Sequence, residues 1–195
     1  MLAYVFWHWK RAEFAASEYE NRQRAFHAAL ASASSSSFLG SFSAGISDLP
    51  WAAEGDGVYE DWYFVRDFAA LGLLNESAVS ASRSAPHDAA AAAAAGGTAG
   101  LYGLRRGTEL HRPRYAHWFG KPDGMNYREL FARIEPVAEG AQGALWMRQM
   151  VLGPAREFCL HASVPVSLAD EFNAFVVPLR PVWPESPGEG EEPGC

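Results

Sequence analysis

A histidine, a carboxylate and an arginine fall on one face of a predicted hairpin near the C-terminus. The hairpin turns at Gly153-Pro154, where an even-length loop places Leu152 across from Ala155. Desolvation moves the pKa values of a histidine and a carboxylate toward neutrality, so His161 and Glu157 are candidates for proton transfer. Arg148 would hold an anionic substrate or an enolate, and Trp146 would contact the substrate. Because strand side chains alternate between two faces, this face carries Trp146, Arg148, Met150, Glu157, Cys159 and His161.

His8 and His117 form a second candidate pair, because they occupy matching places in two similar segments. His8 shares its strand face with Tyr4 and Phe6, which would contact a ligand. If the two segments belong to halves related by a pseudo-twofold axis, both imidazoles and Asp61 project into one cavity. This arrangement predicts a His/carboxylate site at the centre of that cavity. The matching segments are Phe6-Trp7-His8-Trp9 with Tyr115-Ala116-His117-Trp118, and Glu60-Asp61-Trp62 with Arg156-Glu157-Phe158.

Each set also has a purely structural interpretation. Arg148 and Glu157 would form an internal ion pair that neutralises two buried charges, with His161 bonded to a carbonyl. The matching His–Trp pairs would be kept for packing alone. By its helical spacing, His27 is expected on the solvent-facing side of its helix.

The sequence contains no local motif for a metal or a nucleotide. No two histidines have the HxH or HExxH spacing, so no metal site is expected. No P-loop, GxGxxG or GxSxG motif occurs either, so no nucleotide cofactor is expected. Haem would need one proximal histidine in a large apolar pocket, for which His161 or His117 would serve. We therefore expect no cofactor, with haem as an open alternative.

These residues lie on an alternating series of predicted strands and helices. Aromatic and β-branched runs bounded by turn residues predict strands over 2–10, 38–46, 61–68, 101–105, 115–119, 145–152, 157–162 and 176–179. Helical periodicity, a capping box at Ser17-x-x-Glu20 and an alanine run between Pro86 and Gly96 predict helices over 17–31, 69–79, 86–95, 125–137 and 168–175. Residues 1–107 and 112–183 then both follow the order βαββαβ, as two repeats of a single α+β domain.

Two tandem βαββαβ units with these paired segments resemble the dimeric α+β barrel superfamily in its fused form. That superfamily includes monooxygenases without cofactors, small-molecule isomerases and lyases, dye-decolorising peroxidases and chlorite dismutases. The resemblance covers about residues 1–183. It implies two ferredoxin-like sheets closed into one barrel, with helices outside and the ligand inside. A shared fold leaves the reaction open.

The composition argues against several classes of partner. The formal net charge is −7, and 16 scattered basic residues do not make a surface for nucleic acid. No run approaches the ~20 apolar residues that span a bilayer, and no signal-peptide pattern opens the chain, so we expect no membrane partner and a cytoplasmic location. Two cysteines without a CxxC pair predict no disulfide framework. Residues 184–195 are expected to form a flexible acidic tail.

One hypothesis and two alternatives follow. The hypothesis is a small-molecule enzyme in which His8, His117 or His161 is the general acid or base, oriented by Glu157 or Asp61. The alternatives are a barrel that only holds a small ligand and a haem protein. Sheet edges exposed in such folds are often covered by a second chain, so a homodimer is expected.

Overall fold

The computed structural model describes residues 1–32, 37–47, 49–52, 57–108, 112–150 and 153–184, which include only Pro184 of the expected acidic tail. Four α-helices lie within them: α1 (Ala16–Ser32), α2 (Phe68–Ala78), α3 (Ser84–Ala93) and α4 (Tyr127–Gly140). The strands are β1 (Leu2–Lys10), β2 (Phe38–Ile46), β3 (Val58–Val65), β4 (Ala94–Arg106), β5 (Tyr115–Phe119), β6 (Ala144–Met150), β7 (Phe158–Ala162), β8 (Phe175–Pro178) and β9 (Arg180–Trp183). The chain is a mixed α+β protein, as the sequence predicts.

All nine strands form one antiparallel sheet, in the order β8-β5-β7-β6-β4-β1-β3-β2-β9. The four strands β4-β1-β3-β2 and the four strands β8-β5-β7-β6 have the same relative order. The two ends of the sheet, β8 and β9, are separated in the chain only by Leu179, so the sheet closes on itself. The homodimer expected from exposed sheet edges stays a prediction.

The inner face of the sheet carries the main core. Trp7, Trp62, Trp118 and Trp146 come from four different strands and are all 0% exposed. The ring centroids of Trp7 and Trp118 lie 5.4 Å apart, and those of Trp62 and Trp146 lie 5.3 Å apart. Tyr102 of β4 packs into the same cluster. Aromatic side chains of this size bury a large apolar area each, so the inner face of the sheet is a packed aromatic core.

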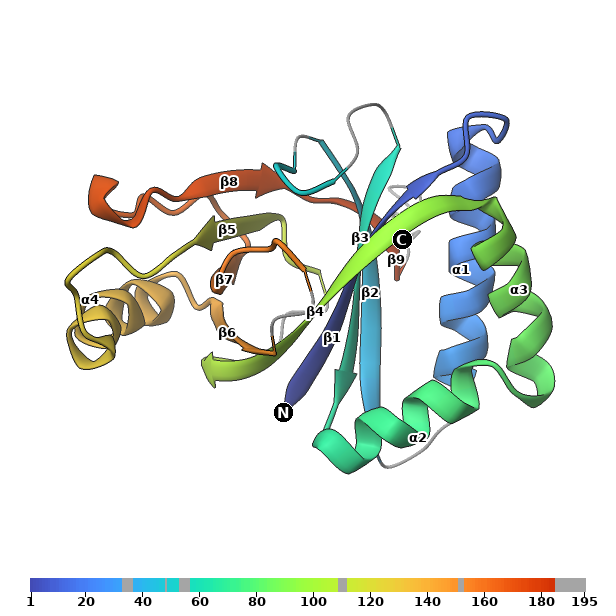
Figure 1. The fold of residues 1–195 in the computed structure, drawn as a ribbon, viewed down its shortest axis with the longest axis horizontal. Coiled ribbons are helices and arrows are strands. Elements are labelled where there is room, and N and C mark those ends of the chain that lie inside the picture. The colour runs from blue at the N-terminus through green and yellow to red at the C-terminus, as the bar shows by residue number, and fades with distance from the viewer. Residues whose placement is uncertain (33–36, 48, 53–56, 109–111, 151–152, 185–195) are drawn as a thin grey trace, which may run out of the picture.

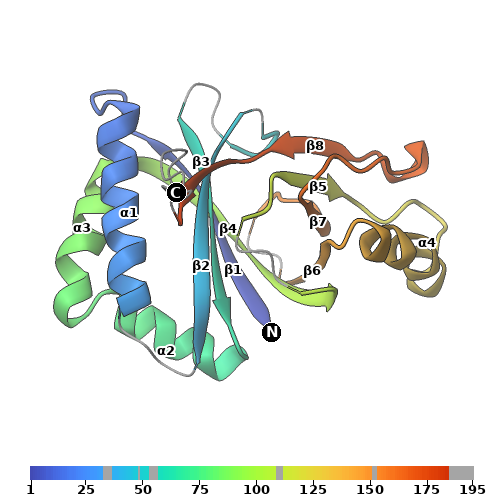
Figure 2. The ribbon, with the colours of Figure 1, turned by 180° about the vertical axis from the view of Figure 1, so that it is seen from behind.

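The helices lie on the outer face of the sheet. Figures 1 and 2 show α1, α2 and α3 beside the strands β4-β1-β3-β2, and α4 beside the other four. Phe26 and Leu30 of α1 pack against Tyr63 of β3. Leu130 and Ile134 of α4 form a separate cluster with residues of β5, β6 and β7. Among the described residues, no helix combines the length and apolar character that crossing a membrane requires.

β4 is longer than the sequence predicts, and the reason is its packing on β1. The alanine run and the glycines after it predict a helix to residue 95, but the strand already begins at Ala94. A Cβ on Gly97 would lie 2.4 Å from Cζ of Phe6, and one on Gly96 would lie 2.8 Å from the Trp9 ring. These glycines therefore let aromatic rings of β1 pack onto β4.

Three smaller differences concern local structure. The helix expected over 168–175 is one 3₁₀ turn, Asp170–Phe172, and β9 is a strand that the sequence analysis does not predict. The expected capping box also fails, because the Glu20 carboxylate accepts hydrogen bonds from Tyr59 and Arg180 instead of from helix amides. Glu20 thus ties α1 to the sheet.

Candidate functional site

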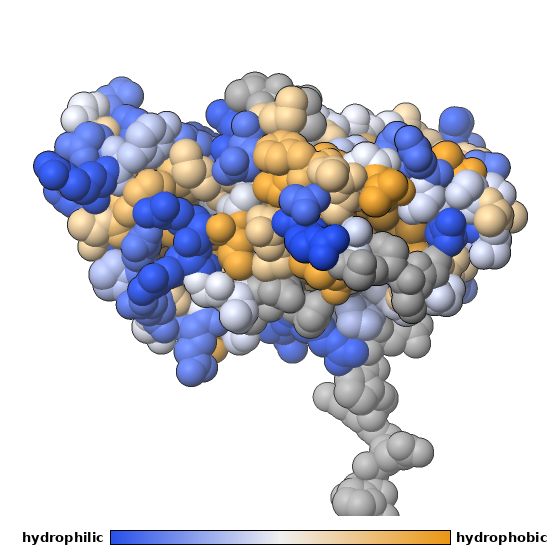
Figure 3. Space-filling model, turned by 90° about the horizontal axis from the view of Figure 1, so that it is seen from below, coloured by the Kyte–Doolittle hydropathy of each residue, from blue (hydrophilic) through white to orange (hydrophobic). Residues whose placement is uncertain are grey.

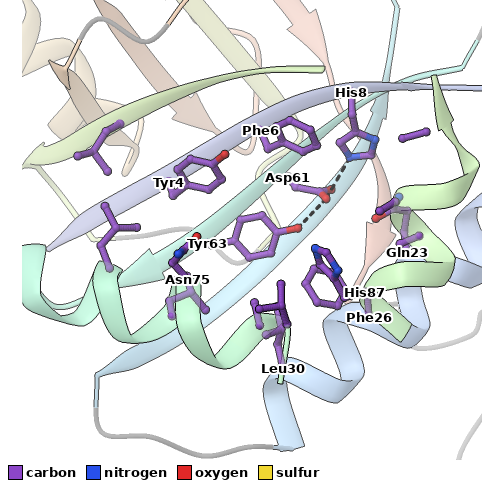
Figure 4. Close-up of a pocket in the computed structure, with 18 of the residues that line it drawn as sticks. Tyr4, Phe6, His8, Gln23, Phe26, Leu30, Asp61, Tyr63, Asn75 and His87 are labelled. Atoms are coloured by element: carbon purple, nitrogen blue, oxygen red, sulfur yellow. Dashed lines mark hydrogen bonds and ion pairs between the residues drawn. The ribbon is translucent and has the colours of Figure 1, made fainter. Parts of the chain in front are cut away.

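A pocket of about 650 Å³ lies between the outer face of the sheet and the helices α1, α2 and α3. This volume falls within the range typical of small-molecule sites. Figure 4 shows that β1 and β3 supply one side of the pocket, with α1, α2 and α3 opposite. The lining is mostly aliphatic and aromatic, and the polar side chains of Tyr19 and Asp61 contact His8. The polar lining residues are His8, Tyr19, Gln23, Asp61, Tyr63, Asn75 and His87, with the Tyr4 hydroxyl.

β1 supplies Tyr4, Phe6 and His8, which alternate along the strand on its helix-facing side. Tyr4 and Phe6 are half-buried, whereas His8 is 1% exposed. The His8 ring stacks on Phe6 at a centroid distance of 5.2 Å and on Tyr59 at 5.7 Å. These neighbours hold the imidazole in one orientation. The sequence prediction that these three residues share a face is confirmed.

His8 lies between a phenol and a carboxylate. The Tyr19 Oη is 2.5 Å from His8 Nδ1, and Asp61 Oδ2 is 3.0 Å from His8 Nε2. The contact with Asp61 is at ion-pair distance without hydrogen-bond alignment. Because a carboxylate can only accept, it favours the tautomer with the proton on Nε2, and Nδ1 then accepts from Tyr19. The order hydroxyl, imidazole, carboxylate is that of a catalytic triad.

Asp61 has further partners, all on one oxygen. The Tyr63 hydroxyl donates to Oδ2 at 2.9 Å, and His27 Nε2 lies 3.4 Å from the same atom. His27 is held by Ser41, whose Oγ is 2.8 Å from Nδ1, and by stacking on Tyr63. Asp61 Oδ1 is buried and has no hydrogen-bond partner among the described residues. An unsatisfied buried acceptor costs about 1–3 kcal/mol, so Oδ1 is a place where a ligand donor would be stabilising.

The charges of this cluster keep the carboxylate ionised and the phenols protonated. Burial raises the pKa of Asp61, but its electrostatic and hydrogen-bond interactions with His8 and His27 outweigh this effect and hold that pKa well below its usual range. Burial, followed by the negative charge of Asp61, raises the pKa of both Tyr63 and Tyr19 above the ordinary value. At neutral pH the cluster therefore contains one carboxylate and two phenols that retain their protons.

The sequence predicts that His8 and Asp61 face the barrel interior. This prediction is wrong, because both side chains face the helices. The interior carboxylate is the neighbouring residue, Glu60, which is 0% exposed. Its two oxygens accept from Trp7 Nε1 at 2.7 Å and from Trp62 Nε1 at 2.6 Å. β3 is buried along its whole length, so its sequence has no polar face to mark the outer side.

The prediction that His117 shares a cavity with His8 is wrong. His117 Nδ1 donates to the Leu160 carbonyl at 3.0 Å, and Nε2 accepts from the Val166 amide at 2.9 Å. Burial lowers the pKa of His117, so the neutral ring is favoured. Backbone groups use both nitrogens, and His117 therefore does not fit the role of a proximal haem ligand.

The register of the strands also corrects the match between Asp61 and Glu157. His8 lies opposite Tyr59 on β3, and Asp61 follows that residue by two positions. His117 lies opposite Leu160 on β7, and the residue two positions further is Ala162. The counterpart of Asp61 is thus an alanine. The histidine is repeated in the second group of strands, but its carboxylate is not.

The hairpin residues proposed for the interior are divided between two places. Trp146 and Cys159 belong to the interior core, and the His161 ring lies 4.3 Å from the Trp62 ring. His161 Nε2 is 3.9 Å from Glu60 Oε1, and burial lowers the pKa of this histidine. Rings of Trp62, Phe42 and Trp146 surround it, so His161 does not fit a haem ligand either.

Arg148 and Glu157 are half-buried outside that core. Arg148 Nη1 donates to the Ala155 carbonyl, and Glu157 accepts from the Tyr127 hydroxyl of α4 at 2.7 Å. The ion pairs found among the described residues do not join the two side chains, and neither lines the pocket. Of the residues that the sequence analysis selects, the structure brings together His8, Asp61, Tyr4 and Phe6.

Tyr19 and His27 are the site residues that sequence reasoning missed. His27, expected in solvent, is 0% exposed. The signal was present in the helix, because its buried residues recur at helical spacing. They are Tyr19, Glu20, Gln23, Phe26, His27 and Leu30. Within the part of the chain that the structure describes, no group of three or more His, Cys, Asp or Glu side chains is placed to hold a metal ion.

No family model and no curated protein matches the chain. Solved structures do. A proposed monooxygenase from Fusobacterium nucleatum aligns with a TM-score of 0.63 at 11% identity, over 93% of this chain and 92% of that one. A proposed monooxygenase from Lactobacillus acidophilus aligns with a TM-score of 0.56 at 10% identity, over 93% and 94%. Identities this low show the fold alone: this chain has the α+β barrel fold of these proteins.

Proposed function

We propose that the protein is a small-molecule enzyme that removes a proton from an apolar ligand bound in the pocket between the sheet and α1, α2 and α3. The observation that carries this proposal is the chain Tyr19–His8–Asp61 on one side of a mostly apolar pocket. His8 is the general base, Asp61 orients it, and Tyr4 and Phe6 contact the apolar part of the ligand.

The proton moves in two linked transfers. The ligand donates its acidic proton to Tyr19 Oη while Tyr19 passes its own proton to His8 Nδ1. The products are a ligand anion, a regenerated phenol and an imidazolium that faces the Asp61 carboxylate at 3.0 Å. In surroundings of low polarity this carboxylate stabilises the imidazolium more strongly than it would in water. The second transfer therefore ends with the positive imidazolium beside the negative Asp61 carboxylate.

Proton removal is compatible with the chemistry named for the structural neighbours. Two of them are proposed monooxygenases, and an oxygenation without a cofactor starts from a substrate anion. This link is an analogy between folds and adds no residue to the argument. The reaction after proton removal is left open by the proposal.

We also infer that the two groups of four strands descend from one repeated βαββαβ unit. Support comes from their identical strand order and from His8 and His117, which occupy matching strands. In this arrangement residues 1–183 form one domain, with repeats 1–107 and 112–183. The first repeat holds the site and the second completes the barrel.

The test uses 2-naphthol, whose neutral and ionised forms absorb and fluoresce at different wavelengths. Bound to the wild-type protein at neutral pH, the probe is expected to show the naphtholate spectrum. In Tyr19→Phe and Asp61→Asn the ratio of ionised to neutral bound probe falls by about tenfold or more, which corresponds to one pKa unit. Binding itself is measured separately by calorimetry.

Tyr102→Phe is the matched control for Tyr19→Phe. It also removes one buried hydroxyl, but that hydroxyl donates to the Arg156 carbonyl, away from the pocket. The control is expected to keep the naphtholate signal. Wild-type ionisation in both Tyr19→Phe and Asp61→Asn overturns the proposal. Binding without ionisation in the wild type favours the non-catalytic alternative, and a Soret band in the purified protein would favour haem.

A further inference from the structure

The part of the pocket wall formed by the alanines of α3 and by Gly72 of α2 carries little side-chain bulk, whereas α1 and the rest of α2 contribute larger residues such as Phe26 and Leu74. Gly72 and Ala78 of α2, Ala90 and Ala91 of α3, and Ala94 at the start of β4 all line it. A Cβ built on Gly72 would have no heavy atom within 4 Å. On the sheet side of the pocket, β1 and β3 contribute the rings of Tyr4, Phe6 and Tyr63 (Figure 4). The pocket is open beside these small residues because they present almost no side chain to fill it.

The second group of strands shows what ordinary side chains do in the same layer. There α4 covers the outer face with Leu130 and Ile134, which are 0% and 1% exposed. Both pack against Phe119, Leu145 and Phe158 of the sheet in one apolar cluster. The layer between helix and sheet is therefore filled by large residues beneath α4, whereas the small residues of α3 and Gly72 leave part of the corresponding layer open over the other group of strands.

A second observation marks the hollow as a ligand site. Asp61 lines the pocket, is 1% exposed, and its Oδ1 has no hydrogen-bond partner among the described residues. A buried acceptor of this kind is stabilised when a donor reaches it. An apolar hollow with one unsatisfied carboxylate oxygen suits a ligand that is mostly apolar and has one acidic O–H or C–H group.

We propose that the alanine run of α3, together with Gly72, determines the size of the ligand. This inference rests on the proposed function for the placement of the acidic group near His8. Between that group and the pocket mouth, the small residues leave room for a bulky apolar body, wider than a single ring. Larger residues at these positions would narrow the pocket and restrict it to small ligands, while leaving the acid–base cluster in place.

Ala91→Phe tests the proposal, with Ala92→Phe as the matched control. Both alanines are exposed on α3, but only Ala91 lines the pocket, so both variants are expected to fold. The probes are phenol and 2-naphthol, and their dissociation constants are measured by calorimetry. Ala91→Phe is expected to weaken 2-naphthol binding by about tenfold, or 1.4 kcal/mol, while phenol binding stays unchanged. Ala92→Phe is expected to leave both unchanged.

The outcomes separate this proposal from the proposed function. Three results would overturn the role of α3 in determining ligand size. They are equal effects of Ala91→Phe and Ala92→Phe, an equal loss of affinity for phenol and 2-naphthol in Ala91→Phe, and no binding of either probe to the wild type. If the probes bind with the expected size dependence but no variant or wild type ionises them, the size role stands and proton removal fails. Gly72→Leu, on the facing side of α2, is expected to reproduce the effect of Ala91→Phe.

Discussion

His8 and His117 show how the same residue type on matching strands acquires different chemistry from its neighbours. His8 stands between a phenol and an ionised carboxylate at the edge of a pocket. His117 has both nitrogens bonded to the backbone, and Ala162 stands where a carboxylate would be needed. The sequence shows that both histidines exist but not which one keeps a partner, because the partners come from other strands and from α1.

The pH dependence of stability tests whether His161 is buried in its neutral form, because desolvation lowers the pKa of this histidine. An unfolded chain protonates histidine near pH 6.5, so between pH 7 and pH 5 the unfolded state binds more protons than the folded state. The free energy of unfolding is therefore expected to decrease as the pH falls through this interval. His161→Phe, which keeps a ring among the indoles, is expected to reduce that decrease.

The measurement is urea unfolding at several pH values between 5 and 7. The decrease is not expected to vanish in His161→Phe, because burial also lowers the pKa of His117. Equal pH dependence in the wild type and in the variant would contradict the burial of a neutral His161.

At the scale of elements, sequence patterns predict where strands lie better than which way they face. The bounds of β1 and β2 agree with the predicted ranges. β1 is rich in aromatic residues, and β2 lies between the serine run before Phe38 and the polar Ser47. The assignment of Asp61 to the interior was wrong because every residue of β3 is buried. In a strand that is buried on both faces, the polarity of successive residues does not distinguish the inner face from the outer face. Only the contacts of its side chains in the structure show which face points into the barrel.

α2 illustrates a second limit, because its sequence is apolar although the helix is little buried. Of its residues only Ala70 is buried, and Phe68 and Leu73 are exposed by 58% and 56%. Figure 3 shows the face of the molecule on which α2 lies. Apolar residues gather near the middle of that face. Helix periodicity predicts the element but not that one side of it borders a pocket.

Gly72 gives a stability test for α2. It lies inside the helix with open space where a Cβ would be. Because alanine favours helix over glycine by about 1 kcal/mol, Gly72→Ala is expected to raise the free energy of unfolding by about 0.5–1 kcal/mol. Gly97→Ala is the contrasting variant and is expected to lower it, because its Cβ would collide with Phe6. Urea unfolding measures both, and a destabilised Gly72→Ala would contradict the open space beside α2.

The whole molecule combines a packed interior with one hollow on its outer face. The closed sheet, with four buried indoles inside, holds β1 and β3 in register and so fixes His8 against Asp61. The resemblance to fused α+β barrels predicts this architecture, and the structural neighbours support it. The expectation of a ligand inside the barrel follows from the resemblance alone. It does not account for the four buried tryptophans and Tyr102 that already pack there.

A crystal structure of the protein in complex with 2-naphthol tests the central claim most directly. The account predicts the naphthol rings between Phe6 and α3, with the oxygen within about 2.6–3.2 Å of Tyr19 Oη or Asp61 Oδ1, the distance needed for proton transfer. A naphthol bound among the indoles beside His161, or one with its oxygen at the pocket mouth near Phe68 and Val79, would contradict it.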